Sequence, residues 1–441
     1  MRKNLDAMTI GLALFSLFFG AGNLIFPPFL GMVAGDKWFL GFVIYFIFDI
    51  GLALIAMLAI SLNDNKLNNV VGKIGQTPAK IIGVVLMICI GPAIVIPRTA
   101  ATTYEMLSNS GVISGQGMLF FTLVYFAIVV LLTIRPTKVI DIIGNFLTPV
   151  LFIGLSFLIV YGIINPIGEI SSVTMVDSIV KEGVTTGYQT MDVFGGLIFA
   201  GIIISSIISK GYKEKKEQRQ ITFKASMLAS VLLLFVYGGL TYLGATVSTK
   251  FGLQVDRTGL LISITNGLLG RFGAIALSAI VSTACLTTAI GLTSASATYF
   301  NKLSNGKVSY KILVLLITGA SITLANLGLD TIINVAGPIL NLIYPVVLTM
   351  IVLSLVPKHN NVFVNYGAVL TVMGISIMVM LYRFGLGFDF INKLPLMDIE
   401  LFWILPAFIG GALGGIIGEL YRINREKIIR NKNSSKPVKV N

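Results

Sequence analysis

The feature that most constrains this chain is a series of long apolar runs, each about as long as a helix that crosses a membrane. A helix rises about 1.5 Å per residue, so about 20 apolar residues span the hydrocarbon layer. Only 12% of the residues are charged, about half the usual share in a soluble domain. The sequence therefore predicts an all-α integral membrane protein with about twelve transmembrane helices. The runs lie at 8–30, 38–62, 80–107, 117–134, 139–164, 192–209, 223–247, 272–300, 310–328, 331–356, 361–384 and 400–421.

The positively charged residues predict the orientation of these helices. Short cytoplasmic loops carry an excess of Lys and Arg. With the N-terminus inside, 24 of the 32 Lys and Arg residues fall in cytoplasmic segments and 7 in external ones. We therefore expect a multi-pass protein of the cell membrane with both termini in the cytoplasm. The net charge of +13 is scattered over short loops, which indicates contact with membrane lipids and no nucleic-acid partner.

Helix-breaking residues interrupt the apolar runs at three places. The first is Gly20-Ala21-Gly22-Asn23, in the middle of the first run; the others are Phe194-Gly195-Gly196 and 334–338. An unpaired backbone group in hydrocarbon costs several kcal/mol, so irregular backbone persists only where protein or a cavity covers it. Glycine pairs also serve close helix packing. At 20–23, two glycines and an asparagine coincide, and this favours a cavity.

The breaks in the first and sixth runs occupy corresponding positions if the first ten helices form two halves of five. Paired breaks of this kind are typical of transporters built from inverted repeats. We expect a five-plus-five inverted repeat with helices 1 and 6 broken and two C-terminal helices added. The expected segments are a cytoplasmic N-terminus (1–7), a first repeat (8–164), an extracellular loop (165–191), a second repeat (192–357), helices 11 and 12 (358–421) and a basic cytoplasmic tail (422–441).

An unwound helix offers two kinds of ligand. The following half-helix begins with free amides and a partial positive charge, which attract a carboxylate. The preceding half ends in free carbonyls, which suit Na⁺. Thr287 and Thr288 place two hydroxyls in the eighth run, and hydroxyl oxygen is also a ligand for hard cations. The alternative is that both hydroxyls bond to the carbonyls one turn back.

Ionisable residues inside the membrane are candidates for function. Asp49, Arg98, Glu105 and Asp192 lie within or at the end of apolar runs. Arg98 and Glu105 are two helical turns apart, and both are candidates for gating or for a buried ion pair. Asp192 is a candidate for the same roles, or for capping the sixth helix.

Four segments together resemble one family. Gly20-Ala21-Gly22-Asn23 is similar to the break of sodium-coupled leucine and neurotransmitter transporters, and Ala284-Cys285-Leu286-Thr287-Thr288 is similar to a stretch of their eighth helix. Nearly the whole chain resembles the bacterial branched-chain amino acid:cation symporter family, within the wider LeuT-type superfamily of amino acid, polyamine and organocation transporters. The segments are Leu17–Pro28, Ile96–Ala100, Gly187–Asp192 and Ala284–Thr288.

The resemblance implies uptake of leucine, isoleucine and valine with Na⁺ across the bacterial plasma membrane. It places the substrate carboxylate on the amides of Ala21 and Gly22. It assigns one Na⁺ to the carbonyls of Ser16, Phe19 and Ala284 and the hydroxyls of Thr287 and Thr288. The Phe18 carbonyl and Asn23 correspond to a second cation position. The remaining substrate contacts are Asn23, Phe194, Gly195 and Gly196.

Other functions remain open or are disfavoured. The alternative is a proton-coupled amino acid transporter of the same fold, with Glu105 or Asp192 carrying the proton. An enzyme is not expected, because the chain has one histidine and shows no nucleophile–base or metal-ligand constellation. We expect a small-molecule substrate, Na⁺ as the coupling ion, no cofactor and no obligate protein partner.

Overall fold

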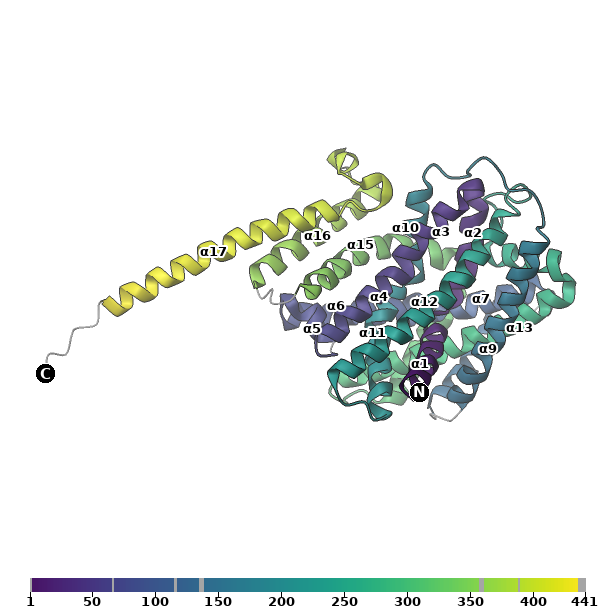
Figure 1. The fold of residues 1–441 in the computed structure, drawn as a ribbon, viewed down its shortest axis with the longest axis horizontal. Coiled ribbons are helices and arrows are strands. Elements are labelled where there is room, and N and C mark those ends of the chain that lie inside the picture. The colour runs from purple at the N-terminus through teal and green to yellow at the C-terminus, as the bar shows by residue number, and fades with distance from the viewer. Residues whose placement is uncertain are drawn as a thin grey trace.

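The structure is a computed structural model that describes residues 2–434 except 66, 115–116, 135–138, 357–360 and 388. Within these residues the chain forms helices joined by turns, and no strand occurs. Eight helical stretches are long and apolar enough to cross a membrane, and three shorter apolar helices accompany them. The predicted all-α membrane fold is confirmed (Figure 1).

The first half of the chain contains five spans, of which the first three are interrupted. Their helices are α1 (Arg2–Phe18) with α2 (Ala21–Ala34), α3 (Trp38–Phe46) with α4 (Leu52–Leu62), α6 (Gln76–Ile88) with α7 (Val95–Asn109), then α8 (Met118–Ile134) and α9 (Val139–Ile164). The second span contains a π-helical turn, Ile47–Gly51, and a similar turn, Cys89–Ala93, interrupts the third. The short helix α5 (Leu67–Val71) lies between the second and third spans.

The second half continues with a second broken span. Its helices are α10 (Ile179–Thr190) with α11 (Asp192–Ser209), α12 (Lys215–Ala245), α13 (Arg257–Leu303), α14 (Tyr310–Ala325), α15 (Leu329–Leu355), α16 (Val362–Arg383) and α17 (Ile404–Ser434). Grouped in this way, the helices of the described part make up the twelve predicted spans. Residues 435–441 of the expected basic tail lie outside the described residues, and α17 covers the rest of that tail.

The sixth span differs from its prediction. The extracellular loop predicted at 165–191 contains α10, and the break lies at Met191, not at Phe194–Gly196. Met191 has a φ of 65°, in the left-handed region, which ends α10 and lets α11 start in a new direction. The α10 segment escaped prediction because its polar residues lower its hydropathy, although the Ser178 side chain caps its first turn. The predicted break at 334–338 is also wrong, since α15 runs through it.

The two broken spans lie inside the bundle. Helices α1 and α2 pack on α12, α10 packs on α3, and α11 packs on α4. Helix α7 packs along α13. By contrast, α16 and α17 lie together at the edge of the bundle, and the far end of α17 extends away from it (Figure 1). Glycines let these two helices approach closely: a methyl group on Gly367 would overlap the Gly410 carbonyl.

Candidate functional site

The first span breaks where the sequence predicts. Helix α1 ends at Phe18, and α2 begins at Ala21 after Gly20 in an extended conformation (φ −107°, ψ −178°). Phe19 is buried, and its ring stacks on those of Phe15 and Tyr237. Because α2 begins anew at Ala21, its first amides have no acceptor within the helix, and they form the positive end of its dipole.

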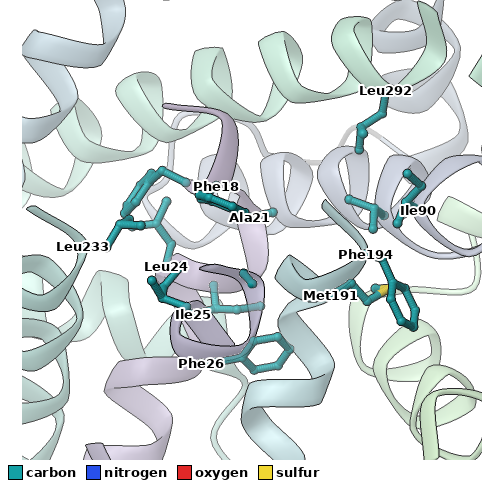
Figure 2. Packing of buried hydrophobic residues seen from close by; sticks show 14 of the residues in the cluster. Phe18, Ala21, Leu24, Ile25, Phe26, Ile90, Met191, Phe194, Leu233 and Leu292 are labelled. Carbon is teal, nitrogen blue, oxygen red and sulfur yellow. The ribbon is translucent and has the colours of Figure 1, made fainter. Parts of the chain in front are cut away.

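A small cavity lies where the two broken spans meet. About 40 Å³ is open to the centres of water molecules, which is room for a few waters. A leucine would therefore require neighbouring side chains to move. Most of the wall is apolar, and Figure 2 shows several of its side chains around the break. The lining residues are Leu17, Phe18, Gly20, Ala21, Asn23, Ile90, Val95, Arg98, Thr190, Met191, Asp192, Gly195, Phe199, Thr288 and Leu292.

Asn23 ties the first break to the sixth span. Its side chain is buried, and Nδ2 donates to the Phe18 carbonyl at 2.9 Å and to Asp192 Oδ2 at 2.6 Å. The same nitrogen contacts the Tyr237 hydroxyl. Phe18 and Asn23, the residues of the possible second cation position, are thus brought together, and Asp192 lies beside them.

A second buried acid lies behind Asp192. Asp49 is fully buried in the π-helical turn of the second span, and its Oδ1 accepts a 2.8 Å hydrogen bond from Thr190. Asp49 and Asp192 are close enough to interact directly. Sequence reasoning found the two acids separately but not as a pair, because they are 143 positions apart in the chain and only the fold joins them.

Arg98 reaches across to the end of α10. Its Nη1 donates to the Gln189 carbonyl at 2.7 Å and its Nη2 to the Thr190 carbonyl at 3.4 Å. Its guanidinium also lies 5.6 Å from the centre of the Phe26 ring. Within the described part of the chain, no acid lies within 4.0 Å of it. The ion pair that the sequence allowed is therefore absent there, and free helix-terminal carbonyls take its place.

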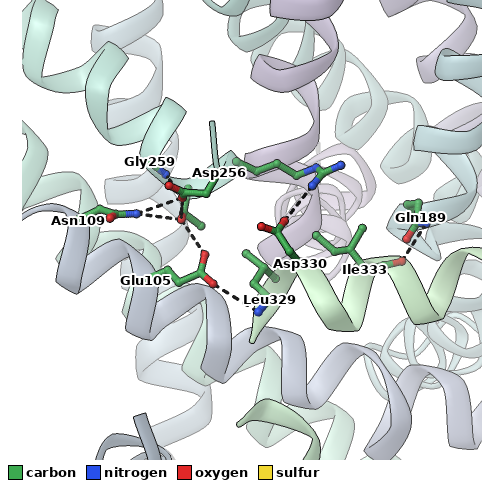
Figure 3. Close-up of polar contacts among 10 residues, drawn as sticks. Glu105, Asn109, Gln189, Asp256, Gly259, Leu329, Asp330 and Ile333 are labelled. Carbon is green, nitrogen blue, oxygen red and sulfur yellow. Dashed lines mark hydrogen bonds and ion pairs between the residues drawn. The ribbon is translucent and has the colours of Figure 1, made fainter. Parts of the chain in front are cut away.

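Glu105 lies outside the cavity. Its carboxylate accepts hydrogen bonds from the Thr258 hydroxyl at 2.8 Å and from the Leu329 amide at 3.3 Å. Figure 3 shows how these contacts join α7 to the beginnings of α13 and α15. The structure thus gives Glu105 a role in joining helices and does not bring it to Arg98.

The predicted Na⁺ ligands are only partly assembled. Thr288 lines the cavity, whereas Ser16, Phe19, Ala284 and Thr287 do not. The Thr288 hydroxyl donates to the Ala284 carbonyl at 3.1 Å, and the Thr287 hydroxyl donates to the Thr283 carbonyl at 2.8 Å. A hydroxyl that donates its proton keeps lone pairs for a cation, so the Thr288 oxygen remains a suitable ligand beside the break.

The predicted contacts on the sixth span separate into one cavity residue and two packing residues. Gly195 lines the cavity. Phe194 packs against Tyr344, with 4.5 Å between ring centres, and a Cβ on Gly196 would lie 2.6 Å from the Ala53 carbonyl. Sequence reasoning missed the apolar lining residues, because they resemble every other apolar residue of a membrane helix. Those residues are Leu17, Ile90, Val95, Phe199 and Leu292.

Solved structures share the arrangement of the helices. A Na⁺-coupled sialic acid symporter in a substrate-bound outward-open state is one of them. The match covers 93% of this chain and 89% of the symporter chain, with a TM-score of 0.58 and 12% sequence identity. MhsT in complex with L-phenylalanine is another. That match covers 93% of this chain and 98% of the MhsT chain, with a TM-score of 0.51 and 16% sequence identity. At these identities the likeness shows the fold, which is the predicted LeuT type.

Sequence comparisons give the family. The branched-chain amino acid permease BraB of Bacillus subtilis (strain 168) is 34% identical over 424 residues, which cover 93% of this chain and 95% of BraB. The permease BrnQ of the same strain is 32% identical over 435 residues, which cover 95% of this chain and 98% of BrnQ. The family model described as "Branched-chain amino acid transport protein" matches residues 3–421. This chain therefore belongs to the branched-chain amino acid transport protein family and is a multi-pass membrane transporter, not an enzyme.

Proposed function

We propose that this transporter carries leucine, isoleucine and valine together with Na⁺, by alternating access to the cavity between the two broken spans. The observation that supports this most strongly is the meeting of both breaks at one small cavity with apolar walls. Such a cavity offers a polar end for the charged groups of an amino acid and an apolar wall for its side chain. The termini would lie in the cytoplasm, in keeping with the distribution of Lys and Arg.

The beginning of α2 is suited to the substrate carboxylate. The amides of Ala21 and Gly22 belong to the first turn of α2, where they have no acceptor within the helix. The substrate side chain would lie against the apolar wall, which includes Ile90, Phe199 and Leu292. An apolar wall distinguishes side chains that differ by one methylene by only about 1–3 kcal/mol. The three substrates should therefore compete for one site.

The end of α1 is suited to Na⁺. The Phe18 carbonyl, which accepts a hydrogen bond from Asn23, belongs to the last residue of α1, and Phe18 and Thr288 line the same cavity. Movement of α13 toward α1 would bring the Ala284 carbonyl and the Thr287 hydroxyl closer to the carbonyls of Ser16 and Phe19. A cation crossing 100 mV gains about 2.3 kcal/mol, which is enough to drive accumulation of a neutral amino acid roughly fiftyfold.

The test is uptake of labelled leucine into proteoliposomes under separate gradients. A Na⁺ gradient should drive uptake without a proton gradient, and isoleucine and valine should inhibit it. Uptake that does not depend on the Na⁺ gradient but is abolished by a proton uncoupler would favour the alternative, a proton-coupled transporter. Of its two candidate proton carriers, Asp192 lines the cavity and Glu105 does not.

A further inference from the structure

Two unlike charges line the central cavity without pairing with each other. Arg98 is 2% exposed and Asp192 is 7% exposed, and both belong to the lining. No ion pair within 4.0 Å joins them. Keeping buried charges apart in apolar surroundings is costly. A ligand that carries both charges would offset that cost.

Arg98 forms the positive side of the cavity. Two of its nitrogens are held by the carbonyls at the end of α10, and its Nε is buried without a hydrogen-bond partner among the described residues. The guanidinium also lies against the start of α2, because a Cβ on Gly22 would be 2.9 Å from Nη2. A guanidinium with one unpartnered nitrogen and a helix N-terminus thus lie side by side, and both favour a carboxylate.

Asp192 forms the negative side. Asn23 holds its Oδ2 at 2.6 Å, so the carboxylate is fixed at the beginning of α11. Asp49 adds a second carboxyl group behind it, and the Oδ2 of Asp49 has no hydrogen-bond partner among the described residues. Two carboxyl groups in contact hold at most one negative charge between them, and that charge favours an ammonium group.

An α-amino acid carries its carboxylate and its ammonium on the same carbon atom, so it needs two opposite charges that are close but not in contact. We propose that Arg98, with the start of α2, binds the substrate carboxylate and that Asp192 binds the substrate ammonium. This assignment rests on the proposed function and deepens it, because it makes the site selective for zwitterionic amino acids. It also links α7, α2 and α11 through one substrate molecule.

The test removes one charge at a time from the protein and from the ligand. Binding of leucine, of isocaproate (leucine without its ammonium) and of isopentylamine (leucine without its carboxylate) is measured by competition with labelled leucine on the purified protein. The wild type should bind each analogue at least about tenfold more weakly than leucine, because each leaves one buried charge unpaired.

Each variant should weaken only the ligands that carry the matching charge. Asp192→Asn should weaken leucine about tenfold or more and leave isocaproate nearly unchanged. Arg98→Gln should weaken leucine and isocaproate and leave isopentylamine nearly unchanged. Asp330→Asn, which removes an acid that pairs with Arg257 away from the cavity, should leave all three affinities as in the wild type.

Other patterns overturn the assignment. A purely structural role predicts that each variant weakens all three ligands by the same factor. If a variant does not fold, Asp192→Glu and Arg98→Lys replace it, because they keep the charges. The binding of the three ligands to the wild type also tests the assignment without any variant: isocaproate bound as tightly as leucine contradicts a role for Asp192. A wild type that requires both charges on another amino acid but rejects leucine would support the assignment and overturn only the proposed cargo.

Discussion

At the residue scale, the central site depends on polar groups that stand out in apolar helices. Asn23, Arg98 and Asp192 are recognisable in the sequence because each is expensive to place in a membrane. Their partners are not recognisable. Asn23 bonds to Asp192, 169 positions away, and Arg98 bonds to carbonyls of α10, 91 and 92 positions away. Only the fold supplies those contacts.

Gly22 should tolerate no side chain. A Cβ there would lie 2.9 Å from Arg98 Nη2 and 3.0 Å from the Phe26 ring. Gly22→Val should therefore abolish leucine binding while the protein still inserts into the membrane. Gly201→Val is the matched control, because a Cβ at Gly201 meets nothing within 4 Å. Binding and membrane yield of both variants are measured together, and normal leucine binding in Gly22→Val would place the substrate elsewhere.

Thr288 and Thr287 should differ in their effect on Na⁺. Thr288 lines the cavity and Thr287 does not. Thr288→Ala should raise the Na⁺ concentration for half-maximal leucine uptake by roughly tenfold, the loss of one ligand to a charged group. Thr287→Ala should raise it less. Uptake across a Na⁺ series checks both, and an unchanged Na⁺ dependence in Thr288→Ala would remove this hydroxyl from the ion site.

At the scale of elements, the two breaks have different causes. The first is predicted by the residues Gly20-Ala21-Gly22-Asn23, and it lies where predicted. The second depends on the left-handed conformation of Met191. Methionine does not favour that conformation, so the sequence does not predict this break. Helix α10 was missed for a related reason: its polar face contacts other parts of the protein instead of lipid, so hydropathy alone does not separate it from a loop.

Gly196 should affect stability more than binding. Its α-carbon lies against α4, and a Cβ would be 2.6 Å from the Ala53 carbonyl. Gly196→Ala should lower stability by about 1–3 kcal/mol through overpacking. Gly201→Ala on the same helix has open space and should raise stability slightly or leave it unchanged. Thermal melting of both variants in detergent tests this, and a Gly196→Ala variant as stable as Gly201→Ala would contradict it.

At the scale of the whole molecule, periodicity and length predicted the fold class well. The apolar runs match the described helices because a membrane requires about 20 apolar residues per span. The cavity was less predictable, since its wall combines residues from the first, third, sixth and eighth spans. The substrate class came from resemblance and is supported by the family match over residues 3–421.

The orientation is testable on the whole molecule by cysteine labelling. The native Cys89 and Cys285 are buried and should react slowly with a membrane-impermeant thiol reagent. Lys37→Cys should be labelled in intact cells, and Lys302→Cys only after the membrane is opened. The reverse pattern would show that the termini lie outside.

The central claim is that one cavity binds a branched-chain amino acid and that Na⁺ strengthens this binding. Equilibrium binding of labelled leucine to the purified protein over a series of Na⁺ concentrations tests it most directly, because linkage requires each ligand to change the affinity of the other by the same factor. The account predicts that leucine affinity rises with Na⁺ and that isoleucine and valine displace the label. Leucine affinity that stays the same when choline replaces Na⁺ would contradict it.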